Sequence, residues 1–308
     1  MIQNPFSQKV KIYTLSAIAL TAIAVLWRSC NFLFFFDTSV DYFQSGPSHA
    51  GLLTLWTLTV AWLLSAIIFI PKHAFSPKAR TETGRASRYT GLICATFTAA
   101  SFFFFRECIT FYIANAQLYN LLAIFSLLSV LYFAFRFLGD TPPAYRALTG
   151  YLAIIWIALM LCATYLNLYV AMNSPFKLTL HLALLSVMLH LLEEVRADTD
   201  HAFRITQLSF TLIAAFHCAM ASIPVLIAFA ANRYQQIDYL FYAALCLVLL
   251  AYLASRAYDC YRLLMVTPLA TEEEIAAEKA KKKEKSNNSK KNTSNADNNA
   301  EGDDPHVS

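Results

Sequence analysis

The sequence predicts an all-α fold, a polytopic bundle of eight transmembrane helices with both chain ends in the cytoplasm. Three observations indicate it: the composition, a succession of long apolar runs, and positive charges that alternate in phase with those runs. The 308 residues are 57% hydrophobic and only 14% charged, with a mean hydropathy of +0.47. Soluble domains carry about 25% charged residues, and soluble cores stop growing at about 250–300 residues. Lipid is therefore the environment that this chain requires.

The apolar runs set the number of spans. A helix needs about 20 mostly apolar residues to cross a bilayer core. Segments that meet this requirement are 12–35, 51–70, 89–112, 119–138, 149–170, 175–194, 206–230 and 238–258. The gaps between them contain turn signals such as Gly46-Pro47 and Pro142-Pro143. Ser174-Pro175 is typical of a helix start, because proline is tolerated at the first helical position.

The distribution of Lys and Arg predicts the orientation. Of the 24 cationic residues, 20 lie at the N-terminus, in or within three residues of every second gap, or from residue 256 onward. Three lie in the remaining gaps or within the last seven or first three residues of the adjoining spans, and Arg28 lies within the first span. Positively charged loops are retained in the cytoplasm, so both termini are expected there. The first apolar run is then interpreted as a retained signal anchor.

Two regions are predicted: a membrane domain, 1–266, and a cytoplasmic region, 267–308, with a Lys-rich helix and a disordered tail. Thr271 and Glu274 form a capping-box pattern, and the Asn/Ser/Asp-rich end is nearly free of apolar residues. Between residues 279 and 291, lysines outnumber acids seven to one. These lysines could contact anionic lipid headgroups. The alternative is a solvated tail that only enforces topology.

The sixth span contains the main candidate site. At helical spacing, small and polar residues share one face of an otherwise apolar helix. They include Thr179, Ser186, His190, Glu193 and Glu194. Ionisable groups inside a membrane are functional candidates by default. His190 with a glutamate one turn later could relay protons or ligate a metal. Alternatively, His190 hydrogen-bonds a neighbouring helix while the glutamates pair with Arg196 or Arg204.

Other ionisable residues give weaker hypotheses. Arg28, Arg106 and Glu107 lie near the outer ends of their spans and could contact an anion or a lipid headgroup. The alternative for the arginines is snorkelling, in which each guanidinium reaches the headgroups from a lipid-exposed stem. His181 and His217 lie at similar depth and could bracket a haem, but no further residue reinforces the pair. We therefore expect no cofactor and no metal.

Several function classes are disfavoured. The chain contains no nucleotide-binding loop, no HExxH and no GxSxG. Its seven cysteines form no CxxC, and a net charge of +4 is too weak to indicate nucleic-acid binding. No gap is long enough for a soluble catalytic domain, so an enzyme is not expected.

Residues 172–196, MNSPFKLTLHLALLSVMLHLLEEVR, and 222–228, SIPVLIA, resemble polytopic membrane proteins of clostridial-type Firmicutes. The shared elements are the Met-Asn-x-Pro-x-Lys helix start, the Leu-rich run ending in Glu-x-Arg, and the Ser-Ile-Pro of the next span. The resemblance implies a bacterial plasma membrane and about eight helices. It implies no mechanism.

Two function classes stay open. One is a permease-like protein for a small solute or ion, with His190 and Glu194 as coupling residues and Pro224 as a helix break. The other is a non-catalytic sensor, scaffold or subunit of a larger membrane complex. A polar cavity that reaches the membrane midplane distinguishes them, because a permease needs one.

Overall fold

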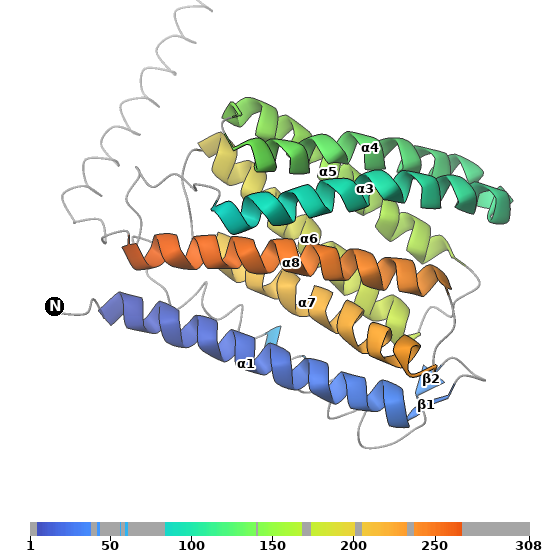
Figure 1. Cartoon of the computed structure of the whole chain (residues 1–308), viewed down its shortest axis with the longest axis horizontal. Coiled ribbons are helices and arrows are strands. Elements are labelled where there is room, and N and C mark those ends of the chain that lie inside the picture. Colours follow the sequence, from blue (N-terminus) through green and yellow to red (C-terminus); the bar gives the residue numbers. More distant parts are fainter. Residues whose placement is uncertain are drawn as a thin grey trace, which may run out of the picture. The chain divides into compact units, whose positions relative to one another are not determined.

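Seven long helices dominate the described part of the structure, a computed structural model, shown in Figure 1. It describes residues 5–37, 42–43, 56, 59–60, 84–139, 141–167, 174–200, 205–232 and 237–266. All of these belong to one compact unit of the chain, which comprises residues 1–70 and 77–267.

The helices are α1 (Pro5–Phe34), α3 (Arg85–Phe111), α4 (Ala116–Leu138), α5 (Pro143–Leu166), α6 (Pro175–Asp200), α7 (Ile205–Ala230) and α8 (Ile237–Val266). A short 3-10 turn, η1 (Ile113–Asn115), joins α3 to α4. After α1, the two-residue strands β1 (Phe36–Asp37) and β2 (Tyr42–Phe43) pair antiparallel, with Phe36 opposite Phe43. The sequence analysis expected only a turn there.

All seven long helices in the described ranges are long and apolar enough to cross a membrane. Large apolar side chains such as Leu26, Phe34 and Phe103 are more than 60% exposed, as lipid-facing residues would be. These features indicate a multi-pass membrane protein. The predicted second span, 51–70, lies outside the described residues except for Trp56, Thr59 and Val60. The predicted cytoplasmic helix and tail, 267–308, also lie outside them, so the count of eight spans stays a prediction.

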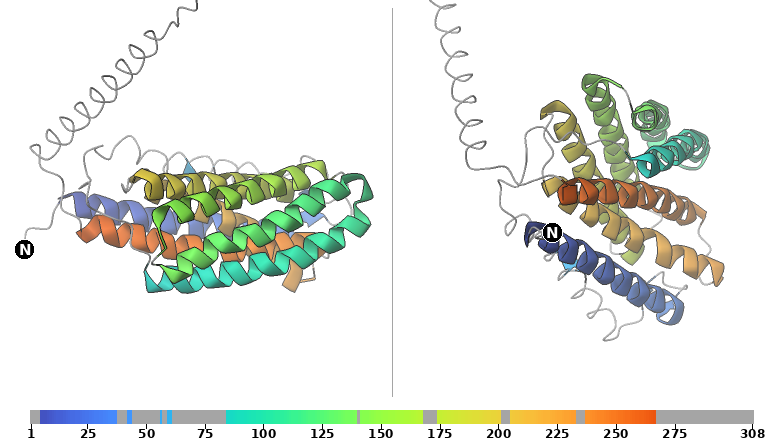
Figure 2. Two further views of the ribbon diagram at one scale, coloured as in Figure 1. Left: turned by 90° about the horizontal axis from the view of Figure 1, so that it is seen from above. Right: turned by 60° about the vertical axis from the view of Figure 1, so that its left-hand side comes forward.

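Helices α3 to α8 form a closed series of neighbours. Each packs against the next in sequence, and α8 also packs against α3. Helix α1 lies outside this series, against α7 and α8, as Figure 1 and the two views in Figure 2 show. Because consecutive helices run in opposite directions, one end of the series gathers the starts of α3, α5 and α7 with the ends of α4, α6 and α8. The charge pattern predicts that this end is cytoplasmic.

The helix boundaries follow local chemistry. Helices α5 and α6 both begin at a proline, Pro143 and Pro175, where no amide donor is required. The second of these was predicted. Helix α4 ends at Leu138, also as predicted, and Gly139 follows with φ +80°. A side chain there would be strained, and a Cβ would lie 2.7 Å from the Arg88 guanidinium.

Two helices continue beyond their predicted C-terminal ends. Helix α6 was expected to end at residue 194 and continues to Asp200, and α8 was expected to end at 258 and continues to Val266. Hydropathy excluded the charged residues in these last turns from the predicted spans. In the structure, Asp198 is buried in an ion pair with Arg136, and Asp259 pairs with Arg256, so these turns remain packed in the bundle.

Gly150 allows α5 and α6 to approach closely. A Cβ at this position would lie 2.3 Å from Cγ2 of Val195 on α6. Both residues are buried, and Val195 immediately follows Glu194. This contact therefore holds α5 against the turn of α6 that contains the main candidate site.

We expect Gly150→Ala to lower the free energy of unfolding by about 1–3 kcal/mol, because overpacking outweighs the helix propensity that alanine adds. Thermal unfolding in detergent measures this. In the double variant Gly150→Ala/Val195→Ala the clash is removed, so the coupling should be favourable by at least about 0.5 kcal/mol. Strictly additive effects would contradict the close approach.

Candidate functional site

The candidate site is centred on Glu194 of α6, which is 1% exposed. Its Oε1 accepts a hydrogen bond from Arg256 Nε of α8 at 2.6 Å. Its Oε2 accepts from the hydroxyl of Tyr252, also on α8, at 3.0 Å, and from the hydroxyl of Tyr132 on α4. Arg136 Nη2, one turn beyond Tyr132, lies 3.5 Å from the same oxygen. One carboxylate thus links three helices.

Two further carboxylates extend this arrangement. Asp198, one turn after Glu194, binds Arg136 Nη2 at 2.7 Å and lies 3.4 Å from Arg146 Nη2 of α5. Asp259 of α8 lies 3.3 Å from Arg256 Nη1.

Asp259 also links α8 to α3. Its Oδ2 accepts hydrogen bonds from the amide of Gly84 at 2.9 Å and from the hydroxyl of Ser87 at 2.5 Å. The ion-pair network therefore joins α3, α4, α5, α6 and α8 at one end of the bundle.

We refer to these residues, with His190, as the Glu194 cluster: Tyr132, Arg136, Arg146, His190, Glu194, Asp198, Tyr252, Arg256 and Asp259. It contains three arginines and three carboxylates, so its formal charge balances when His190 is neutral. Balance matters because an uncompensated charge buried in a protein is strongly destabilising. Arg136, Arg256, Glu194 and His190 are each 1% exposed.

His190 lies one turn before Glu194 and connects the cluster to α7. Its Nδ1 is 2.9 Å from the Thr211 hydroxyl, which itself donates to the carbonyl of Gln207 at 2.5 Å. Since that hydroxyl has one proton, it accepts from His190, which places the imidazole proton on Nδ1. Nε2 then points its lone pair toward Glu194 Oε2, 3.8 Å away.

Several buried polar atoms here have no hydrogen-bond partner within the described residues: Arg136 Nε, Arg146 Nε, Arg256 Nη2, His190 Nε2 and Gln207 Oε1. Each unsatisfied buried group costs about 1–3 kcal/mol. Ordered water or a polar ligand is the usual partner of such groups. The cluster is therefore charge-balanced, and these atoms are the positions where ordered water or a polar ligand would bind.

The predicted stripe on α6 divides into separate environments. Glu193 is half-buried, binds Arg196 at 3.0 Å and accepts from the Thr206 hydroxyl at 3.1 Å. The sequence analysis gave pairing with Arg196 as the alternative to a functional role for the glutamates, and Glu193 makes this pair. The same expectation for Glu194 is corrected, since Glu194 pairs with Arg136 and Arg256 instead.

The remaining stripe residues lie away from the cluster. Ser186 donates to the carbonyl of Ala183 at 2.9 Å. Thr179, 15 residues before Glu194 and thus about 22 Å along the helix, accepts from Arg28 Nη2 at 2.6 Å. The stripe is therefore not one continuous site.

The predicted outer site is not assembled. Arg28 is buried, with its guanidinium 5.2 Å from the Phe32 ring centroid and 5.9 Å from that of Trp56. Snorkelling therefore does not describe Arg28. Arg106 and Glu107 are exposed, so they do not share its environment.

The two histidines considered for haem have different neighbours. His181 Nε2 lies 3.1 Å from the Thr164 hydroxyl of α5. The ring of His217 lies 5.7 Å from that of Trp56 and 5.2 Å from that of Phe216. Within the described ranges, no group of three or more His, Cys, Asp or Glu residues is placed to hold a metal.

The sequence analysis missed most of the cluster, although a signal was present. Tyr132–Arg136 and Tyr252–Arg256 repeat the same Tyr-x-x-x-Arg spacing at corresponding ends of two spans. At helical periodicity, each pair lies on one helix face. His190, Glu194 and Asp198 share that spacing. These spacings indicate one polar edge on each of α4, α6 and α8, and the three edges face one another in the bundle.

No protein family, curated protein or solved structure matches this chain significantly. The resemblance to clostridial-type membrane proteins thus stays a prediction, and the argument for function depends on the geometry of the bundle.

We expect Arg256→Gln and Glu194→Gln each to lower the free energy of unfolding by about 3–5 kcal/mol, because each leaves buried groups uncompensated. The double variant should lose less than the sum of the two. Arg262→Gln, an exposed change two turns later on α8, should stay within about 0.5 kcal/mol of wild type. Thermal unfolding in detergent measures all four proteins. An Arg256→Gln protein as stable as Arg262→Gln would contradict the ion-pair network.

Proposed function

We propose that this chain is a permease-like protein of a bacterial plasma membrane that translocates a small solute or ion. His190 and Glu194 are its coupling residues. Both chain ends lie in the cytoplasm, so the Glu194 cluster lies toward the cytoplasmic side. The tail lysines remain candidate contacts for anionic lipid headgroups.

The observation that best supports this proposal is the burial of Glu194, an ionisable group, among two tyrosines and two arginines. A buried ion pair is weak evidence for stability, because apolar residues of similar volume are often as stable or more so. Ionisable groups at membrane depth commonly mark ion or substrate pathways.

The geometry also supports a proton as the coupling ion. A proton on His190 Nε2 would face Glu194 Oε2, now 3.8 Å away, and attract that carboxylate. That oxygen already accepts hydrogen bonds from the hydroxyls of Tyr252 and Tyr132 and lies 3.5 Å from Arg136 Nη2. Protonation of His190 would therefore weaken the bonds that tie α6 to α4 and α8. Such a competition couples proton binding to opening of this end of the bundle.

The alternative is a non-catalytic scaffold, sensor or subunit. It is favoured by the same burial, since His190 and Glu194 are 1% exposed and the cluster is charge-balanced. Helix α7 also continues through Pro224, so the expected helix break does not support a permease. Proton flux distinguishes the two classes.

We expect purified protein in liposomes to admit protons when a potassium gradient and valinomycin impose a negative interior, as reported by an enclosed pH-sensitive dye. Glu194→Gln should reduce this flux at least tenfold, because His190 then lacks its competing carboxylate. Glu193→Gln, the adjacent half-buried glutamate, should change it less than twofold. Both variants are compared at equal reconstitution and after a thermal-unfolding check.

Flux equal to that of protein-free liposomes would overturn proton translocation and favour the scaffold class. Equal effects of Glu193→Gln and Glu194→Gln would overturn the assignment of Glu194.

The orientation has its own test. Alkaline phosphatase is active only outside the cytoplasm, and green fluorescent protein, exported unfolded, fluoresces only inside. We expect fluorescence and no phosphatase activity from fusions at either terminus, because positive charge is retained inside. Reporters that place the two ends on opposite sides would overturn the even number of spans.

A further inference from the structure

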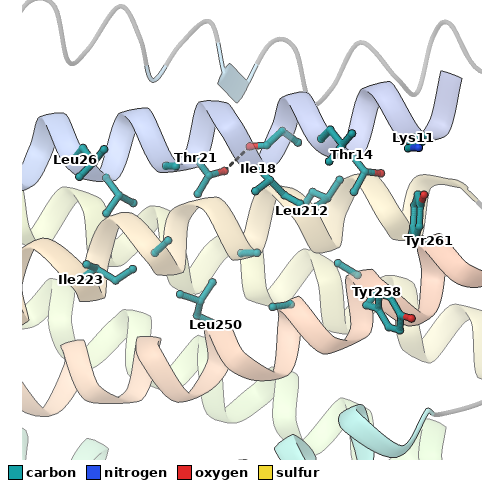
Figure 3. A pocket seen from close by; sticks show the side chains of 18 residues that line it. Lys11, Thr14, Ile18, Thr21, Leu26, Leu212, Ile223, Leu250, Tyr258 and Tyr261 are labelled. Carbon is teal, nitrogen blue, oxygen red and sulfur yellow. Dashed lines mark hydrogen bonds between the residues drawn. The ribbon is translucent and has the colours of Figure 1, made fainter. Parts of the chain in front are cut away.

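An apolar groove runs between α1, α7 and α8, on the outer side of the helix series (Figure 3). Its volume is about 730 Å³. Small residues form much of its wall: Ala17, Ala22, Ala215, Ala219, Ala254 and Ala257. Its edges include the exposed side chains of Leu15, Ile18 and Leu26.

Polar groups gather at only one end of this groove. Figure 3 shows Lys11, Tyr258 and Tyr261 at that end and Leu26 and Ile223 at the other. Lys11 and Tyr258 are exposed. An ammonium group and two phenol hydroxyls together suit an anionic, hydrogen-bond-accepting ligand.

Along its length the groove offers no further polar partner. The hydroxyls of Thr14 and Thr21 already donate to carbonyls of their own helix, those of Val10 at 2.9 Å and Ala17 at 2.7 Å. A ligand that fits must therefore be apolar beyond its charged end.

The dimensions favour a narrow ligand. From Lys11 to Leu26, α1 advances about 22 Å at 1.5 Å per residue. Helix α1 already packs against both α7 and α8, so a further helix about 10 Å wide does not fit between them. An acyl chain is thinner and can lie along the whole wall.

The charged end of the groove also lies at the level of the membrane where a lipid headgroup is expected. Lys11 is near the start of α1, and Tyr258 and Tyr261 are near the end of α8. Charge distribution predicts this end to be cytoplasmic, where anionic headgroups attract basic side chains. Tyrosines are enriched at the same interface.

We propose that this groove binds one anionic phospholipid of the cytoplasmic leaflet. One acyl chain lies between α1 and α8 over α7, and the phosphate contacts Lys11, Tyr258 and Tyr261. This site is separate from the Glu194 cluster and does not depend on the permease proposal.

The test is native mass spectrometry of the full chain in detergent, titrated with dioleoyl phosphatidylglycerol or dioleoyl phosphatidylcholine. We expect phosphatidylglycerol to bind more tightly. Lys11→Gln should weaken it roughly fivefold, the effect of one cation at a lipid surface. Lys9→Gln, an exposed lysine that does not line the groove, should change it less than twofold.

A second pair of variants tests the acyl-chain wall. Ala254→Trp fills the groove and should abolish the tightest lipid adduct, whereas Ala251→Trp, exposed on the same helix but outside the groove, should retain it. If Ala254→Trp does not fold, the lysine pair alone decides the result.

Equal affinity for the two lipids, or equal effects of Lys9→Gln and Lys11→Gln, would overturn the proposal. A dimer that Ala254→Trp alone dissociates would also overturn it, since the occupant would then be a second copy of the chain.

Discussion

The structure depends on neutralising one carboxylate, that of Glu194, which is buried among the helices. Arg136 and Arg256 supply the opposite charge from two different helices, and each needs a further carboxylate, Asp198 or Asp259. Removing any partner leaves an uncompensated charge that costs several kcal/mol. The ends of α4, α6 and α8 are therefore held together by the need to pair buried charges, in addition to their apolar contacts.

Apolar contacts in lipid give little direction to helix packing, because lipid tails are as apolar as leucine. Small residues and polar groups determine which helices meet. Gly150 allows α5 to approach α6 beside the cluster, and Asp259 ties the start of α3 to α8 through Gly84 and Ser87. At the opposite end, among the described residues, Arg28 binds Thr179, and Lys177 Nζ donates to the carbonyls of Tyr165 and Asn167 at 2.9 and 3.0 Å. An added proton or ion would thus disturb buried ion pairs at the Glu194 end and these hydrogen bonds at the opposite end.

Hydropathy predicted the seven described helices well, because membrane spans need a minimum length of apolar sequence. It failed at the ends of α6 and α8, where Asp198 pairs with Arg136 of α4 and Asp259 binds the start of α3. Periodicity on one helix identified His190 and Glu194, since a single helix fixes which of its residues share a face. It could not identify Arg136 or Arg256, which were counted as loop cations, because their role depends on helices distant in sequence. The repeated Tyr-x-x-x-Arg spacing was the available signal, and it becomes interpretable only once α4 and α8 are known to flank α6.

The same cations that orient the chain also build its interior. Arg136 and Arg256 contribute to the positive charge that predicts the cytoplasmic side, and both are buried at 1% exposure. A cation used only for topology would remain in water, where its hydration is retained. Burying it requires an acidic partner at matching depth on another helix, as Glu194 and Asp198 provide on α6. Orientation and packing are therefore not independent here. Moving a span by one turn relative to its neighbours would separate these charges, so the cluster fixes the register of α4, α6 and α8 as well as their contact.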